Sequence, residues 1–110
     1  MSAAEPPRSE VLACYERLRA LSRQLLGHAR REEWAALPAL EEQCSAIVEM
    51  LRLIEPFESL DAQQLLHKHA LLSRIRGDYD AIGEAVAPQL DHLREVLQTM
   101  QRQRMLQIYR

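Results

Sequence analysis

The sequence contains few aromatic residues, few glycines and only two cysteines. Among its 110 residues are one Trp, one Phe, three Tyr and three Gly. The apolar share is nevertheless 47%, and Leu and Ala supply most of it, which is the composition of helices that pack on other helices. A chain of this length forms one domain. We therefore expect a small all-α protein.

The sequence also lacks a long apolar run and an excess of positive charge. No stretch approaches the ~18 apolar residues of a membrane span, so we expect no membrane insertion. The net charge is −2, with Arg and Glu interspersed, whereas nucleic-acid binding needs a concentrated positive patch. We therefore predict no nucleic-acid partner. Residues 1–7 lack the basic and apolar regions of a signal peptide, which favours a cytoplasmic (cytosolic) protein.

Motifs that carry catalysis or hold cofactors are missing as well. The sequence has no Glu-x-x-His for a di-metal site, no Gly-rich phosphate loop, no Cys-x-x-Cys and no nucleophile elbow. His67 and His69 are two residues apart, so on a helix they point about 200° apart. Asp78 and Asp80 diverge in the same way and are predicted to be surface charges. We expect no enzyme, no metal and no cofactor.

The two cysteines, Cys14 and Cys44, are predicted to stay free. In an antiparallel hairpin that turns near Glu32, the two sulfurs would lie about 9 Å apart along the helix axis. A disulfide does not span that distance. We therefore expect two buried thiols.

The stretch from Trp34 to Glu55 has the clearest helical pattern. Its apolar residues alternate in steps of three and four, the repeat of a helix whose seam faces other helices. The seam comprises Leu37, Leu40, Cys44, Ile47, Leu51 and Ile54. Pro38 requires regular hydrogen bonding to begin within residues 34–37, because proline is tolerated only in the first turn. We predict that this helix is the centre of a bundle, with antiparallel neighbours on either side.

Both neighbours have recognisable boundaries. Ser9 is a suitable N-cap for a first helix that ends near Arg31. The second helix stops at Glu55, because the residue before a proline is pushed out of the helical region. Asp61 and Gln64 form a capping box at the start of a third helix over residues 61–85. Its predicted core seam is Leu65, Lys68, Leu72, Ile75, Tyr79, Ile82 and Val86.

Pro88 is predicted to separate this helix from a fourth, in which it takes the first position. The fold class is therefore all-α: an antiparallel bundle of three long helices plus a C-terminal fourth helix. Residues 9–110 form this single domain. Residues 1–8 are expected to be disordered, because Pro6 and Pro7 resist helix formation and no pattern repeats there.

The fourth helix supplies the candidate partner-binding surface. Leu90, Leu93, Leu97 and Met100 lie on one stripe, but the apolar residues beyond Met100 do not keep to one face, as expected of a segment that awaits a partner. The candidate binding residues are Val96, Leu97, Met100, Met105, Leu106, Ile108 and Tyr109. For Leu93, Leu97 and Met100 the alternative is a place in the core. The alternative for Met105, Leu106, Ile108 and Tyr109 is a reversible cover over an apolar groove.

Several short segments, taken in order, resemble one protein family. They are Tyr15-Glu16-Arg17-Leu18, Leu21-Ser22, Glu33-Trp34, Leu40-Glu41, Val48-Glu49-Met50-Leu51-Arg52, Glu55-Pro56 and the closing Arg104, Leu106 and Tyr109. Over residues 9–109 the sequence resembles the flagellar export chaperone family FliT. The resemblance implies a cytoplasmic protein that binds the filament-cap protein FliD and brings it to the export ATPase and gate proteins. Some relatives also bind the transcriptional activator FlhDC, so the resemblance implies this partner as a further expectation.

The same amphipathic surfaces are also compatible with a second hypothesis. The chain could be a structural or regulatory interaction protein, for example a helical homodimer, without a secreted client. The sequence separates the two hypotheses poorly, because both use an apolar helix face that binds another protein.

Overall fold

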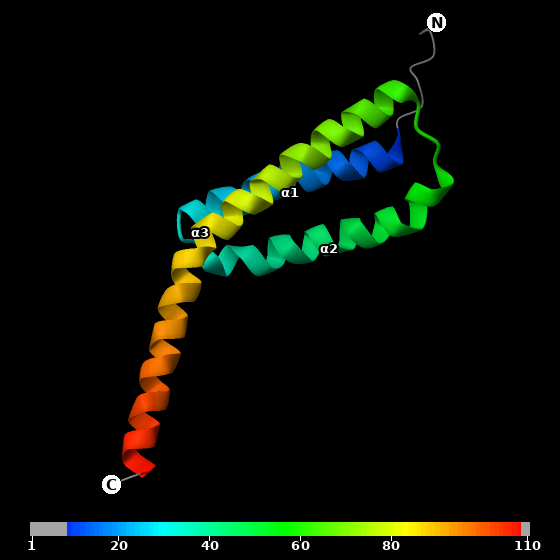
Figure 1. Ribbon diagram of the computed structural model, residues 1–110. Helices are drawn as coiled ribbons and strands as arrows, with labels where there is room; N and C mark the ends of the chain where they lie inside the picture. The colour runs from blue at the N-terminus through cyan, green and yellow to red at the C-terminus, as the bar shows by residue number, and fades with distance from the viewer. Residues whose placement is uncertain (1–8, 109–110) are drawn as a thin grey trace, which may run out of the picture.

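A computed structural model describes residues 9–108, and all of its regular elements are helical (Figure 1). The elements are α1 (Glu10–Arg30), the short 3₁₀ helix η1 (Trp34–Ala36), α2 (Leu37–Ile54), a second 3₁₀ helix η2 (Glu55–Phe57) and α3 (Ala62–Ile108). The predicted all-α class is confirmed. The prediction for residues 1–8 lies outside the described residues.

The predicted helix boundaries hold at three points, each for a local reason. The Ser9 side chain accepts a hydrogen bond from the Leu12 amide at 3.0 Å and so caps α1. Pro38 lies in the first turn of α2, where its missing amide costs nothing. Asp61 and Gln64 form the reciprocal capping box: each side chain accepts from the other residue's amide, at 2.8 and 2.9 Å.

The centre of the fold is α1, not α2, so the predicted arrangement is wrong on this point. The helix α1 packs against both α2 and α3, whereas α2 and α3 scarcely approach each other. In Figure 1, α3 runs along α1 and α2 lies apart from that pair. The reason is the width of the apolar face of α1, which is broad enough to serve two neighbours. Its buried core residues are Val11, Cys14, Tyr15, Leu18, Leu21 and Leu25.

The buried face of α3 is also displaced from the predicted seam. Leu71 and Asp78 are the residues of α3 that are buried, while Leu72 and Tyr79 remain 38% and 42% exposed. The helix is turned so that Leu71 and Asp78 are buried in place of the predicted Leu72 and Tyr79, whereas Ile75 and Ile82 of the predicted seam do pack against the core. Apolar periodicity could not indicate this, because one of the buried positions carries a carboxylate.

Asp78 is not the surface charge that the sequence predicts. It is only 6% exposed. The Ser22 hydroxyl donates a hydrogen bond to its carboxylate at 2.7 Å, and the Arg19 Nε lies 3.1 Å from the same oxygen. The Arg19 contact is ionic rather than a well-aligned hydrogen bond. Asp80, on the other side of α3, is exposed as predicted.

Pro88 does not separate two helices, so the predicted fourth helix is wrong. It lies inside α3, which is a single helix of 47 residues. Proline removes one backbone hydrogen bond and kinks a helix without necessarily ending it. Figure 1 shows α3 changing direction where its colour passes from yellow to orange. The described protein is accordingly elongated, with extents of 85 × 27 × 22 Å.

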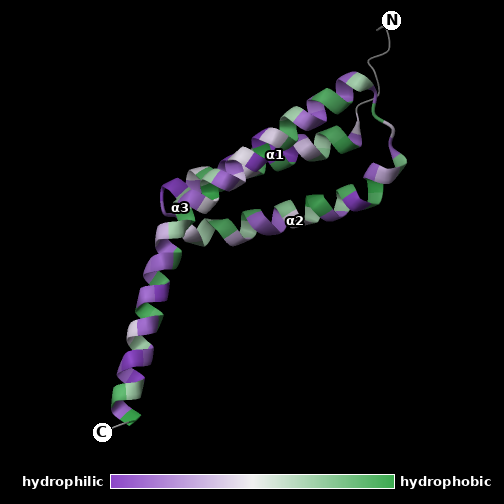
Figure 2. Cartoon of the chain, in the orientation of Figure 1, coloured by the Kyte–Doolittle hydropathy of each residue, from purple (hydrophilic) through white to green (hydrophobic). Residues whose placement is uncertain are grey.

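Residues 87–108 of α3, called the C-terminal arm from here on, project from the rest of the protein. Every residue of the arm is exposed, and Figure 2 shows apolar and polar residues alternating along it. At helical rise the arm is about 33 Å long. Because every residue of the arm is exposed, its apolar side chains lack the neighbours that normally bury them.

Cys14 and Cys44 are both free and buried, which confirms the predicted thiols. The Cys14 Sγ lies 3.8 Å from the Met50 Sδ. Burial raises the pKa of the Cys14 thiol, and the nearby Arg17 opposes this shift only in part. The thiol therefore stays protonated and acts as a small core side chain.

The buried Asp78 generates a stability prediction. Asp78→Ala should lower the free energy of unfolding by about 3 kcal/mol, because it leaves the Arg19 charge without its partner in a mostly buried place. Asp80→Ala is the matched control and should change it by less than ~0.5 kcal/mol. Urea unfolding followed by circular dichroism measures both, and similar small effects would contradict the role given to Asp78.

Candidate partner-binding groove and C-terminal arm

An apolar groove lies between α2 and α3, above α1. It encloses about 430 Å³. Its lining residues come from all three helices: Tyr15 and Leu18 of α1, Cys44, Val48, Leu51 and Arg52 of α2, Glu55 of η2, and Leu72, Ile75 and Tyr79 of α3. The groove exists because α2 and α3 both rest on α1 but do not close on each other.

The walls of the groove are apolar and partly open to solvent. Val48 on α2 is 39% exposed, similar to Leu72 and Tyr79 opposite it. The floor is buried, with Leu18 and Leu51 in the core. Such a surface is typical of a site that receives one amphipathic helix, because the floor and walls supply the apolar contacts that a fourth bundle helix would make.

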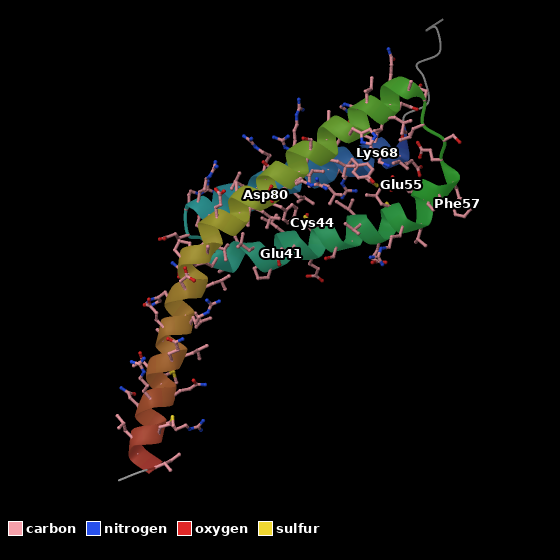
Figure 3. The ribbon with its side chains drawn as sticks, viewed as in Figure 1. Glu41, Cys44, Glu55, Phe57, Lys68 and Asp80 are labelled. Carbon is pink, nitrogen blue, oxygen red and sulfur yellow. The ribbon has the colours of Figure 1, made fainter. Side chains whose placement is uncertain are left out.

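A polar cluster closes the groove at the end near η2. The Tyr15 hydroxyl donates to the two carboxylate oxygens of Glu55 at 2.9 and 3.0 Å. The Lys68 ammonium pairs with the same carboxylate and lies 5.5 Å from the centre of the Tyr15 ring. Figure 3 shows Lys68 and Glu55 close together in this region. The cluster joins one residue each from α1, η2 and α3.

The cluster shifts the pKa values of its members. Burial, followed by the hydrogen bond to Glu55, raises the pKa of Tyr15 to about 12. Burial also raises the pKa of Glu55, but the hydrogen bonds from Lys68 and Tyr15 and the Lys68 charge outweigh it, so that pKa lies below its ordinary 4.5. Glu55 is therefore an anion at neutral pH. It holds the three helices together at this end.

At the other end of the groove, Tyr79 and Cys44 lie against each other. Burial and the hydrogen bond with the Cys44 thiol raise the pKa of the Tyr79 hydroxyl to about 12. The carboxylate of Glu41 adds to this shift. The Tyr79 phenol is therefore neutral at neutral pH, which suits an apolar occupant of the groove.

The residues predicted to bind a partner lie on the arm, away from the groove. Val96, Leu97, Met100, Met105, Leu106 and Ile108 are between 40% and 71% exposed. Tyr109 lies outside the described residues. The alternative that Leu93, Leu97 and Met100 are core residues is wrong, because each is more than half exposed. The cause is the continuity of α3, which carries them away from α1 and α2.

Neither the groove nor the continuity of α3 was predicted, although the sequence contains a signal for each. The seam predicted for residues 65–86 and the stripe predicted for residues 90–100 follow in phase across Pro88, because Val86 and Leu90 are four residues apart. A continuous phase indicates one helix rather than two. Val48, one place beyond the seam of α2, marked the other wall.

Among residues 9–108, no three His, Cys, Asp or Glu side chains are grouped so as to hold a metal ion. None of the helices described there is both long and apolar enough to cross a membrane.

Comparison with known proteins identifies relatives of this chain. The family model described as flagellar protein FliT matches residues 12–110. The crystal structure of flagellar protein FliT from Bordetella bronchiseptica is similar, with a TM-score of 0.75 and 30% sequence identity. That match covers 80% of this chain and 99% of the Bordetella chain. Among curated proteins, none matches the sequence.

The polar cluster generates a prediction of pH dependence. Because the pKa of Glu55 is lowered by folding, its contribution to stability is complete above pH ~4.5 and is lost as the pH falls through the lowered value. Glu55→Gln should lower the free energy of unfolding by about 1 kcal/mol at pH 7. The difference from the wild type should vanish in acid.

Urea unfolding at pH 7 and in acid measures this effect. Glu49→Gln is the control, since Glu49 makes only an exposed pair with Arg52. A Glu55→Gln penalty that persists unchanged in acid would show that the ion pair is not its origin.

Proposed function

The chain belongs to the FliT family of flagellar proteins, and on this basis we propose that it is a flagellar export chaperone. It binds the filament-cap protein FliD in the cytoplasm and delivers it to the export apparatus, through contacts with the export ATPase and gate proteins. The family assignment supports the flagellar setting. The groove and arm support the binding role.

The observation that carries the proposal is a continuous apolar stripe on α3. It runs from the groove wall onto the arm, in steps of three and four residues. The α3 stripe, as it is called below, comprises Leu72, Ile75, Tyr79, Ile82, Val86, Leu90, Leu93, Leu97 and Met100. Its members on the arm are all exposed. Exposed apolar surface of this extent marks a site of protein interaction.

In this proposal the client supplies an amphipathic helix. One part of that helix fills the groove and contacts Val48, Leu72 and Tyr79. The remainder follows the stripe onto the arm. There the proposed contacts are Val96, Leu97, Met100, Met105, Leu106, Ile108 and Tyr109. Unbranched methionines adapt to different side chains, which suits a surface that holds a client temporarily.

The same surface supports negative regulation of flagellar transcription. When the client is absent, the stripe is free to bind another protein, and we propose the activator FlhDC as that partner. Resemblance to family members suggests this role. Client binding would then release FlhDC, because both proteins use one surface.

A first prediction concerns the groove. Val48→Glu should weaken binding of the C-terminal segment of FliD at least ~10-fold, because a charge under the apolar face of a helix costs more than 1.4 kcal/mol. Leu53→Glu, an exposed residue of α2 that does not line the groove, is the matched control and should leave the affinity unchanged. Isothermal calorimetry measures both variants.

Two outcomes would count against the proposal. If the wild type shows no binding at micromolar concentration, the chaperone role for FliD is wrong and the structural or regulatory alternative is favoured. Equal effects of Val48→Glu and Leu53→Glu would place the client elsewhere on the protein.

A second prediction concerns the arm. Deletion of residues 101–110 should weaken client binding but leave the melting temperature nearly unchanged, because residues 101–108 are exposed and do not pack on the bundle. Calorimetry and thermal denaturation test this together. A loss of several degrees with unchanged affinity would refute it.

A further inference from the structure

The groove between α2 and α3 carries a carboxylate at the end where Tyr79 and Cys44 meet. Glu41 of α2 lines a hollow that shares both of these residues with the groove. After burial and the hydrogen bond with Cys44, the charge of Glu41 also contributes to the raised pKa of Tyr79. Asp80 of α3 lies at the same end, with Cys44 between it and Glu41 in Figure 3. This end of the groove is therefore negative.

Toward η2, the exposed charges beside the groove are cationic. Arg52 of α2 lines the groove itself and comes eleven residues after Glu41, about 16 Å along the helix axis. Arg76 of α3 lines a second hollow, which adjoins the groove at Leu72. It precedes Asp80 by one helical turn. The sign of the charge thus changes along the axis of the groove.

Contacts within the chain leave these charges available to a partner. In the described part of the chain, Glu41, Asp80 and Arg76 belong to no ion pair. Arg52 lies 3.4 Å from Glu49, but these side chains are 72% and 68% exposed, and an ion pair so open to water contributes little. The polar cluster near η2, in contrast, contains one anion and one cation that neutralise each other.

An amphipathic helix in the groove turns its polar flanks toward both rims, because its apolar face rests on the floor. Charges on such flanks set the orientation of paired helices. A client cation beside Glu41 and a client anion beside Arg76 or Arg52 are separated by about one to three helical turns. The same helix turned end for end places like charges together, which disfavours that orientation.

We propose that the groove accepts its client helix in one direction only, with a Lys or Arg of the client against Glu41 and an Asp or Glu of the client against Arg76 or Arg52. The inference rests on the proposed function, since it describes the client that the groove holds. The occupant is a helix with an apolar face and opposite charges at its two ends. The buried floor supplies affinity, while the rim charges supply specificity and faster association.

The kinetics of binding between the full chain and the C-terminal segment of FliD test the rim charges. Glu41→Lys should slow association and weaken affinity roughly threefold to tenfold. Glu42→Lys is the matched control, because Glu42 is exposed, undergoes the same change of charge and does not line the groove. Arg76→Glu and Arg74→Glu form a second pair of the same design, in which only Arg76→Glu should slow association.

Salt separates the charge effect from packing. At about 1 M salt, screening acts over roughly 3 Å, so the penalty of Glu41→Lys should largely disappear. The penalty of Val48→Glu should persist, because that variant places a charge under the apolar face of the client. Circular dichroism of each variant verifies that its helix content is kept.

A nitroxide label on the client tests the direction. Placed at the end of the client helix that carries the cation, the label should broaden the amide signals around Glu41 and leave those around Phe57 of η2 sharp. In the variant that combines Glu41→Arg, Arg52→Glu and Arg76→Glu, the charge order of the groove is reversed. The label should then broaden the signals around Phe57 instead.

Several results would overturn the inference while the chaperone role stands. These are equal effects of Glu41→Lys and Glu42→Lys, broadening at both ends of the groove, or a bound client helix without a cation to place at Glu41. In each case the wild type binds its client. Absence of wild-type binding would instead overturn the proposed function, and the direction of the client with it.

Discussion

The contact of Asp78 with Arg19 and Ser22 sets how α3 is turned against α1, and the other surfaces of the protein depend on that turn. A carboxylate that is 6% exposed is stable only where a cation and a hydrogen-bond donor compensate for its lost hydration. Both compensating groups are on α1, so α3 presents the face of Asp78 and Leu71 to that helix. The Glu55 cluster with Tyr15 and Lys68 holds the same orientation at the opposite end of the groove.

Once α3 is turned in this way, its most regular apolar stripe faces the core only in part, through Ile75 and Ile82. Leu72 and Tyr79 become a wall of the groove, and Leu93, Leu97 and Met100 continue the stripe on the arm. The core is completed by the broad apolar face of α1. The protein therefore has three helices that bury part of one another's apolar surface, and it has a groove that a fourth helix can occupy. Binding of a client helix would complete the four-helix arrangement.

Much of the fold follows from local chemistry and was predicted. Ser9, Asp61 and Gln64 cap helices through contacts within one turn, and Pro38 is confined to a first turn by its missing amide. The wrong predictions for Asp78 and Pro88 share one cause. A prediction from apolar periodicity assumes that every carboxylate is solvated and that every proline in the middle of the sequence ends a helix. Asp78 breaks the first rule because Arg19, far away in the sequence, lies beside it, and Pro88 breaks the second because a helix can kink at proline without ending.

The sequence by itself determined the all-α class and most helix boundaries, since these depend on neighbours within a few residues along the chain. It also determined the free thiols, because helical rise in a hairpin keeps Cys14 and Cys44 apart. Only the tertiary structure decided which face of α3 is buried, that α1 rather than α2 is central, and that a groove remains open between α2 and α3. Those outcomes depend on side chains as far apart in sequence as Ser22 and Asp78, or Tyr15 and Glu55. Packing in three dimensions brings these side chains together, and helical periodicity does not predict which of them will meet.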